Sequence, residues 1–163
     1  MEQRVQFWQK SKMKTEDLKK EFEKHFDDFE KWNKEFEFEF IDFEKGNFLK
    51  IMCRGIVSRL QNWISYVTPF FFPGGTYSSV IQSNIKDEET IRKTKELYKE
   101  FMSYYHEGLI AEFSSDEKKQ IEYIKKFFKN YSKLKKEVIL ILEISKDVFD
   151  ELNFEKKEKG YLG

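Results

Sequence analysis

Residues 18–43 read LKKEFEKHFDDFEKWNKEFEFEFIDF, and the large apolar side chains of this stretch recur at the spacing of an α-helix. At 100° per residue they fall within an arc of about 120°, while most other positions carry charge. The arc holds Leu18, Phe22, His25, Phe26, Phe29, Trp32, Asn33, Phe36, Phe40 and Phe43. We therefore expect one amphipathic helix whose aromatic face packs against other apolar faces of the chain.

The end of this stretch, residues 35–43, reads EFEFEFIDF and begins with the strict alternation that is typical of a β-strand. Phe38 and Ile41 also lie off the helical arc. We favour a helix, because the 3.6-residue period continues from Leu18 and because glutamate is a poor strand former. A strand is the alternative.

Three further helices follow. Residues 48–67 are amphipathic and come directly after Gly46-Asn47, a helix stop signal. Acidic residues 87–89 open a helix that runs to about residue 112, and residues 114–117 form a capping box for a last, very long helix. Within it, VILIL at 138–142 is apolar on all sides, so we expect neighbours to enclose it. The sequence thus predicts an all-α protein, a four-helix, largely antiparallel bundle with long first and last helices.

The chain of 163 residues suits a single helical domain. Residues 1–14 are expected to form an N-terminal arm or to extend the first helix. Residues 68–86 contain both prolines and are expected to form an irregular Phe/Pro/Gly loop, and residues 155–163 a frayed tail. A single alanine against 18 phenylalanines predicts widely spaced helices.

The longest apolar runs are too short to cross a bilayer, and the N-terminus lacks the apolar core of a signal peptide. A single cysteine excludes an internal disulfide, so we expect a reduced, cytoplasmic protein. The wealth of lysine and glutamate is typical of proteins from hyperthermophiles, although an AT-rich genome also favours lysine. The 30 basic and 30 acidic residues cancel, so a charged partner would be recognised by a local patch.

One spacing resembles a catalytic motif. Cys53 and Arg59 are separated by five residues, which resembles the phosphate loop of cysteine-dependent phosphatases. That resemblance implies a thiolate nucleophile at Cys53 and a phosphate clamp at Arg59. The loop holds one glycine, and no βαβ pattern surrounds it, so we name no catalytic residue.

The only histidines, His25 and His106, lack the helical spacing of a metal site. We therefore predict neither a metal nor another cofactor, and we interpret His25 as a histidine of the core or its rim.

Charge is more strongly patterned. Residues 118–136 contain eight lysines and one acid, and a helix places these lysines on a positive strip about 27 Å long. The strip predicts phosphate binding by Lys118, Lys125, Lys126, Lys129, Lys133 and Lys136. The alternatives are a solvated helix face, or pairing with the acidic face of residues 27–44, within the chain or in a neighbouring subunit.

Residues 46–86 contain no acid and include Phe70, Phe71 and Phe72. Exposed, these rings would contact a partner; folded back, they would plug one end of the bundle, which is the arrangement we favour.

We rank three functions. The first is a non-enzymatic helical interaction or assembly protein that acts through aromatic helix faces, either as a homo-oligomer, most simply a twofold dimer joined by overhanging long helices, or with a helical protein partner. The second is a nucleic-acid-binding accessory subunit, and the third is the phosphatase-like enzyme.

Overall fold

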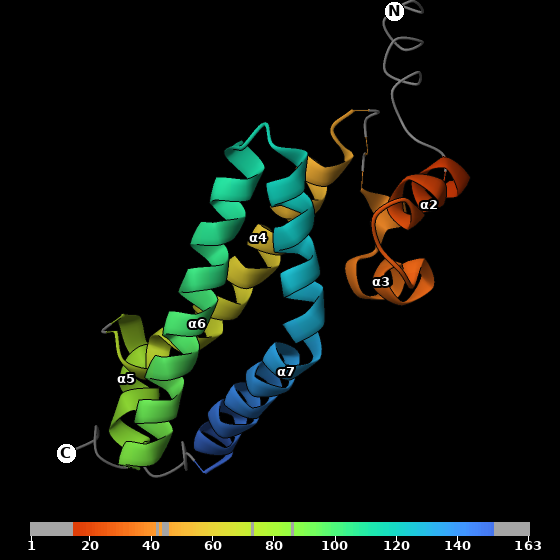
Figure 1. Cartoon of the computed structure of the whole chain (residues 1–163). Helices are drawn as coiled ribbons and strands as arrows, with labels where there is room; N and C mark the ends of the chain where they lie inside the picture. Colours follow the sequence, from red (N-terminus) through yellow and green to blue (C-terminus); the bar gives the residue numbers. More distant parts are fainter. Residues whose placement is uncertain (1–14, 42, 44–45, 73, 86, 152–163) are drawn as a thin grey trace, which may run out of the picture. The chain divides into compact units, whose positions relative to one another are not determined.

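The computed structural model describes residues 15–41, 43, 46–72, 74–85 and 87–151. Every regular element in this part of the chain is helical, which confirms the all-α class (Figure 1). The α-helices are α2 (Thr15–Glu23), α3 (Phe29–Phe36), α4 (Phe48–Val67), α5 (Gly75–Asn84), α6 (Glu88–Phe113) and α7 (Glu117–Asp150). Two 3₁₀-helices, η1 (Phe38–Phe40) and η2 (Thr68–Phe70), complete the set. No helix within these ranges has the length and apolar character needed to cross a membrane.

The prediction of one helix over residues 18–43 is wrong. The chain leaves α2 after Glu23, turns, and enters α3 through Asp28, which has a left-handed conformation with φ 62°. A second left-handed residue, Glu37 with φ 53°, ends α3, and η1 follows. Residues 35–43 are therefore neither a continuous α-helix nor a strand in their described part.

The breaks bring the aromatic rings together. In one continuous helix Phe22 and Phe38 would lie about 24 Å apart along the axis, at 1.5 Å per residue. In the structure their ring centroids are 5.7 Å apart. The turn at Glu37 also changes which rings point inward: Phe38, predicted off the apolar arc, is buried, and Phe40, predicted on it, is 75% exposed.

The predicted starts of the later helices are confirmed. α4 spans the predicted residues, and it follows Gly46, whose φ is 88°. α7 begins after Asp116, whose carboxylate accepts a hydrogen bond of 3.0 Å from the Lys118 amide. The N-cap is therefore Asp116 and not Ser114, as the predicted capping box required; Ser114 supports the cap by accepting a bond from the Asp116 amide.

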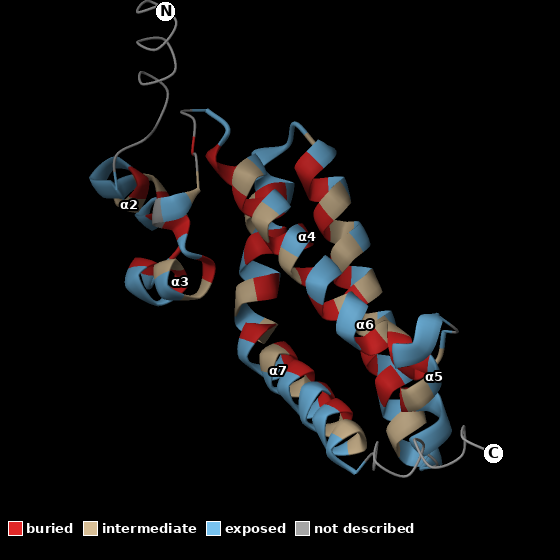
Figure 2. Ribbon diagram, turned by 180° about the vertical axis from the view of Figure 1, so that it is seen from behind, coloured by how far each residue is buried: buried red, intermediate tan, exposed pale blue. Residues whose placement is uncertain are grey.

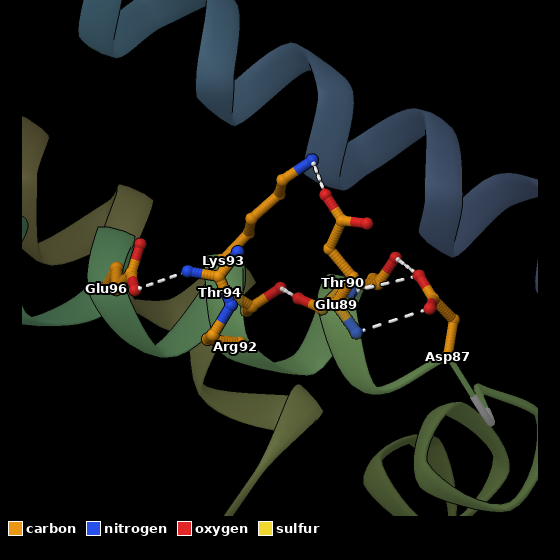
Figure 3. Close-up of polar contacts among 7 residues, drawn as sticks. All are labelled: Asp87, Glu89, Thr90, Arg92, Lys93, Thr94 and Glu96. Atoms are coloured by element: carbon orange, nitrogen blue, oxygen red, sulfur yellow. Dashed lines mark hydrogen bonds and ion pairs between the residues drawn. The ribbon is translucent and has the colours of Figure 1, made fainter.

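Figure 3 shows the start of α6, where Asp87 is the cap. Its carboxylate accepts hydrogen bonds from the Thr90 amide at 3.0 Å and from the Glu89 amide at 3.2 Å. Together with the Thr90 hydroxyl, these donors hold the pKa of Asp87 below its usual value. Ion pairs Glu89–Lys93 and Arg92–Glu96 continue along the helix, one turn apart in each case.

The chain forms two compact units. Unit 1 comprises the described residues of Met1–Arg59 together with Tyr105–Lys129, and unit 2 comprises those of Leu60–Tyr104 and Asn130–Gly163. Each of α4, α6 and α7 contributes one part to each unit. The single-domain organisation stays a prediction. The expected arm (1–14) and tail (155–163) lie outside the described residues.

Unit 1 has an aromatic core. Phe22 is completely buried, and its ring lies within 6.5 Å of five other phenylalanine rings. These are Phe26, Phe29, Phe38, Phe48 and Phe128. Also in unit 1, α4, α6 and α7 pack closely at Gly108, where an added Cβ would lie 2.6 Å from Val57 Cγ2 and 2.7 Å from Tyr123 Cζ. The wide spacing between helices that the composition predicts is therefore not found at this point.

Unit 2 is built around Trp63, whose ring centroid lies 5.7 Å from both Phe101 and Tyr131. Residues 68–86, expected to be irregular, contain η2 and α5 in their described part. Gln82 links the two, because its side-chain amide donates hydrogen bonds to Pro69 O and Phe72 O. A local sequence pattern cannot reveal this support. The apolar residues of α5 do not form a clear helical face, and the hydrogen-bond partners of Gln82 lie 10 or more residues away.

Candidate functional site

Cys53 and Arg59, the phosphatase-like pair, lie on the continuous helix α4. Cys53 is fully buried, and burial raises the pKa of its thiol to about 12, with Glu112 as a smaller cause. The Arg59 guanidinium donates a 2.6 Å hydrogen bond to Glu35 O and lies 5.0 Å from the centre of the Phe36 ring. The thiol is therefore protonated at neutral pH, the arginine joins α4 to α3, and no phosphate loop connects them.

The histidines lie in separate surroundings. His25 is half-buried, with its ring 5.9 Å from that of Phe26, and His106 is exposed beside Tyr105. Among the residues that the structure describes, no three His, Cys, Asp or Glu side chains gather as metal ligands would.

The six lysines predicted to bind phosphate are all exposed on α7, but they fall into two groups. Lys126 pairs with Glu107 at 2.7 Å, and Lys133 pairs with Glu100 at 3.1 Å. The other four, Lys118, Lys125, Lys129 and Lys136, form no ion pair with any described residue. A phosphate would therefore compete with a carboxylate at Lys126 and Lys133, but it would displace no ion pair with a described residue at the other four.

Lys125 and Lys129 border a hollow of about 330 Å³ in unit 1. Its floor contains the stacked rings of Trp32 and Phe128, whose centroids are 3.7 Å apart. Lys31 lies over Trp32, and Asp27 and Asp28 stand on the rim. The predicted acidic neighbours are therefore present here, and they would repel a phosphate.

The three adjacent phenylalanines differ in exposure. Phe70 is buried, Phe71 is half-buried, and Phe72 is 46% exposed. Phe71 and Phe72 both pack on Tyr98 of α6, with centroid distances of 5.0 and 5.7 Å.

The sequence-based predictions did not include the two most exposed large apolar side chains on the described α-helices. Ile110 and Phe113 lie one turn apart at the end of α6, in unit 1, and are 66% and 79% exposed. Ile110 lies on the opposite side of the helix from the buried Phe101, and Phe113 lies just beyond the predicted end of this helix near residue 112. This placement is itself a signal, because an isoleucine and a phenylalanine three residues apart on a solvent face are unusual.

Phe113 borders a cavity of about 510 Å³ in unit 1. Apolar atoms come from Phe48 and Leu49 at the start of α4, and polar groups come from the α6–α7 turn and α2. The polar and charged residues of the lining are Glu21, Lys24, His25, Asn47, Lys50, Ser114, Ser115, Glu117 and Gln120. Gln120 is held in place by hydrogen bonds to Ala111 O and Ser114 O.

A second exposed apolar group lies on α7 in unit 2. Val138 and Ile141 are buried, but Ile139, Leu140 and Leu142 are 41–47% exposed. The expectation that neighbours enclose residues 138–142 therefore holds for Val138 and Ile141 but not for Ile139, Leu140 and Leu142. Figure 2 shows buried and exposed residues alternating along α7, as in a helix with one covered face.

Comparison of the chain with models of protein families, with curated proteins and with solved structures finds no match in any of the three.

Proposed function

We propose that this chain is a non-enzymatic interaction protein, a helical bundle that binds an amphipathic helix of another protein through unit 1. The observation that carries the proposal is the exposure of Phe113 at 79%, beside Ile110 at 66%. Burying one such side chain stabilises a complex by about 1.5–3 kcal/mol, so the two together can supply most of the binding free energy of a complex of modest affinity.

The chemistry of the adjoining cavity supports a protein partner. It combines the apolar edges of Phe48 and Leu49 with uncharged polar side chains and with charged ones, among them Glu21, Lys24 and Lys50. An apolar anchor residue with polar neighbours, as one face of an amphipathic helix provides, suits such a lining. The exposed Phe113 ring then covers the anchor from one side and excludes water from it.

This proposal differs from the sequence-based expectation in its surface. The aromatic face of residues 18–43 is largely buried inside unit 1, so it is not offered to a partner. The first helix of the described residues, α2, is also short, so it does not supply the long overhanging helix from which a dimer was expected.

A photo-reactive phenylalanine analogue at position 113 tests the proposal. We expect it to form one discrete adduct in cells that make the full chain. Ile110→Asp should reduce this adduct about 10- to 100-fold, since it removes one buried side chain of the contact. The matched control carries the analogue at Lys34, which is exposed on α3 of the same unit. Equal adducts at both positions, or an adduct insensitive to Ile110→Asp, would contradict the proposal.

The second candidate function is nucleic-acid binding by Lys118, Lys125 and Lys129. The observation that favours it is the absence of ion pairs between these exposed lysines and the described residues of the chain. If they bind phosphate, changing all three to glutamate abolishes retardation of single- and double-stranded DNA. Binding by the unmodified protein should fall with salt at a log–log slope of about −3, because each contact releases a counterion.

The control for this test is Lys126→Gln with Lys133→Gln, since both side chains already pair with α6 glutamates. This variant should bind DNA as the unmodified protein does. No retardation of DNA or RNA by the unmodified protein at low salt would eliminate the second candidate.

A further inference from the structure

The exposed side of α7 within unit 2 carries apolar and charged side chains in a regular order. Ile139 lies at its centre, and Leu140 and Leu142 lie on its two edges. Lys136 and Glu143 stand one turn before and one turn after Ile139 on the same side of the helix. This surface, called here the α7 face, is defined by Lys136, Ile139, Leu140, Leu142 and Glu143.

The charges of the α7 face lack partners among the residues that the structure describes. Lys136 and Glu143 form no ion pair or hydrogen bond with any residue in the described ranges. By contrast, two lysines near them are already engaged, Lys133 with Glu100 and Lys146 with Asp150. The face therefore presents one free positive charge and one free negative charge on either side of an apolar centre.

We propose that the α7 face binds a second copy of this chain, with the two α7 helices antiparallel. A twofold axis between residues 139 and 140 places Lys136 of each copy opposite Glu143 of the other. The same axis places Ile139 against Leu140 and forms two identical charge pairs around a shared apolar centre.

The charge order along α7 favours a second copy over an unrelated partner. Residues 132–136 of the helix carry three lysines and no acid, whereas residues 143–151 carry four acids and one lysine. Antiparallel self-pairing sets the basic part of each copy against the acidic part of the other. A parallel arrangement would instead oppose like charges along the whole contact, which costs affinity.

In this antiparallel arrangement, Lys133 of one copy and Lys146 of the other lie at the same height along the helix axis, and both carry positive charge. These residues lie about 140° apart around the helix at 100° per residue: Lys146 falls about 20° from Ile139, and Lys133 about 120° from it, beyond Leu140. Lys133 therefore lies outside the α7 face, so the two lysines do not meet. Their existing pairs with Glu100 and Asp150 remain in place.

Charge reversal tests the pairing on the full chain, with mass measured by light scattering at low salt. We expect the unmodified protein to be a dimer at a concentration of tens of micromolar, because an interface of moderate affinity is largely occupied at that concentration. Lys136→Glu and Glu143→Lys should each weaken the dimer about tenfold or more, because each creates two like-charged pairs. The double variant should restore the unmodified affinity, a result that loss of folding cannot produce.

Lys99→Glu is the matched control, since it makes the same change of charge on an exposed lysine of α6 in the same unit. It should leave the dimer unchanged. A monomeric unmodified protein, or a double variant no tighter than the single ones, would overturn the inference.

Cross-linking tests the direction. Cys53 is buried and protonated, so a short bis-maleimide should react only with an introduced cysteine. Ile139→Cys should cross-link, because its two copies lie about 1.5 Å apart along the axis. Lys146→Cys should not, because its two copies lie about 20 Å apart. Equal cross-linking at both positions would indicate a parallel pair and overturn the antiparallel assignment.

This inference is independent of the proposed function. It concerns unit 2, whereas the Phe113 adduct depends on unit 1, so either result can fail without the other.

Discussion

Phe22→Ala should lower the free energy of unfolding by about 3–5 kcal/mol, the largest effect expected of any single change in this chain. Phe22 is 0% exposed, and its ring joins α2, α3, η1, α4 and α7 within unit 1. Alanine would remove the group that these five elements share and leave a cavity between them. The loss is a large part of the 5–15 kcal/mol that a typical domain has in total.

Urea unfolding followed by circular dichroism measures this effect. The control is Phe113→Ala, which shortens the same type of side chain at a position that is 79% exposed. Its unfolding free energy should change by no more than about 0.5 kcal/mol. Similar losses for both variants would show that Phe22 does not hold unit 1 together.

Gly108→Ala should destabilise the chain by about 1–3 kcal/mol, even though alanine is about 1 kcal/mol better than glycine inside a helix. The new Cβ would lie 2.6 Å from Val57 Cγ2 and 2.7 Å from Tyr123 Cζ, well inside van der Waals contact. Val57 and Tyr123 are both buried, so neither side chain can move away freely. The helices of unit 1 would have to separate locally.

Gly55→Ala is the matched control and should have the opposite sign. Gly55 also lies within a helix, α4, but a Cβ there meets nothing within 4 Å. Only the helix propensity then acts, and the unfolding free energy should rise by about 0.5–1 kcal/mol. Stabilisation by both substitutions, measured by the same urea unfolding, would show that α6 does not approach α4 and α7 closely at Gly108.

The candidate interaction residues could be identified from the sequence only in part. The lysines of α7 were recognised as a group, but their pairing was not, because Glu107 and Glu100 lie 19 and 33 residues away. The Cys53 and Arg59 spacing suggested chemistry that the continuous helix α4 removes. Ile110 and Phe113 were not identified, because their position on the helix only suggests exposure and the packing decides it.

The sequence by itself determined the all-α class, the bounds of α4 and the starts of α6 and α7. Their signals are local: Gly46 before α4, the Asp87 carboxylate at the start of α6 and the Asp116 carboxylate at the start of α7. A cap or a stop acts on the few residues next to it, so it can be read without the rest of the chain. Tertiary structure alone decided the path of residues 18–43. A 3.6-residue period is satisfied equally by one long helix and by two short ones, and only the burial of Phe22 against Phe38, Phe48 and Phe128 favours the broken path.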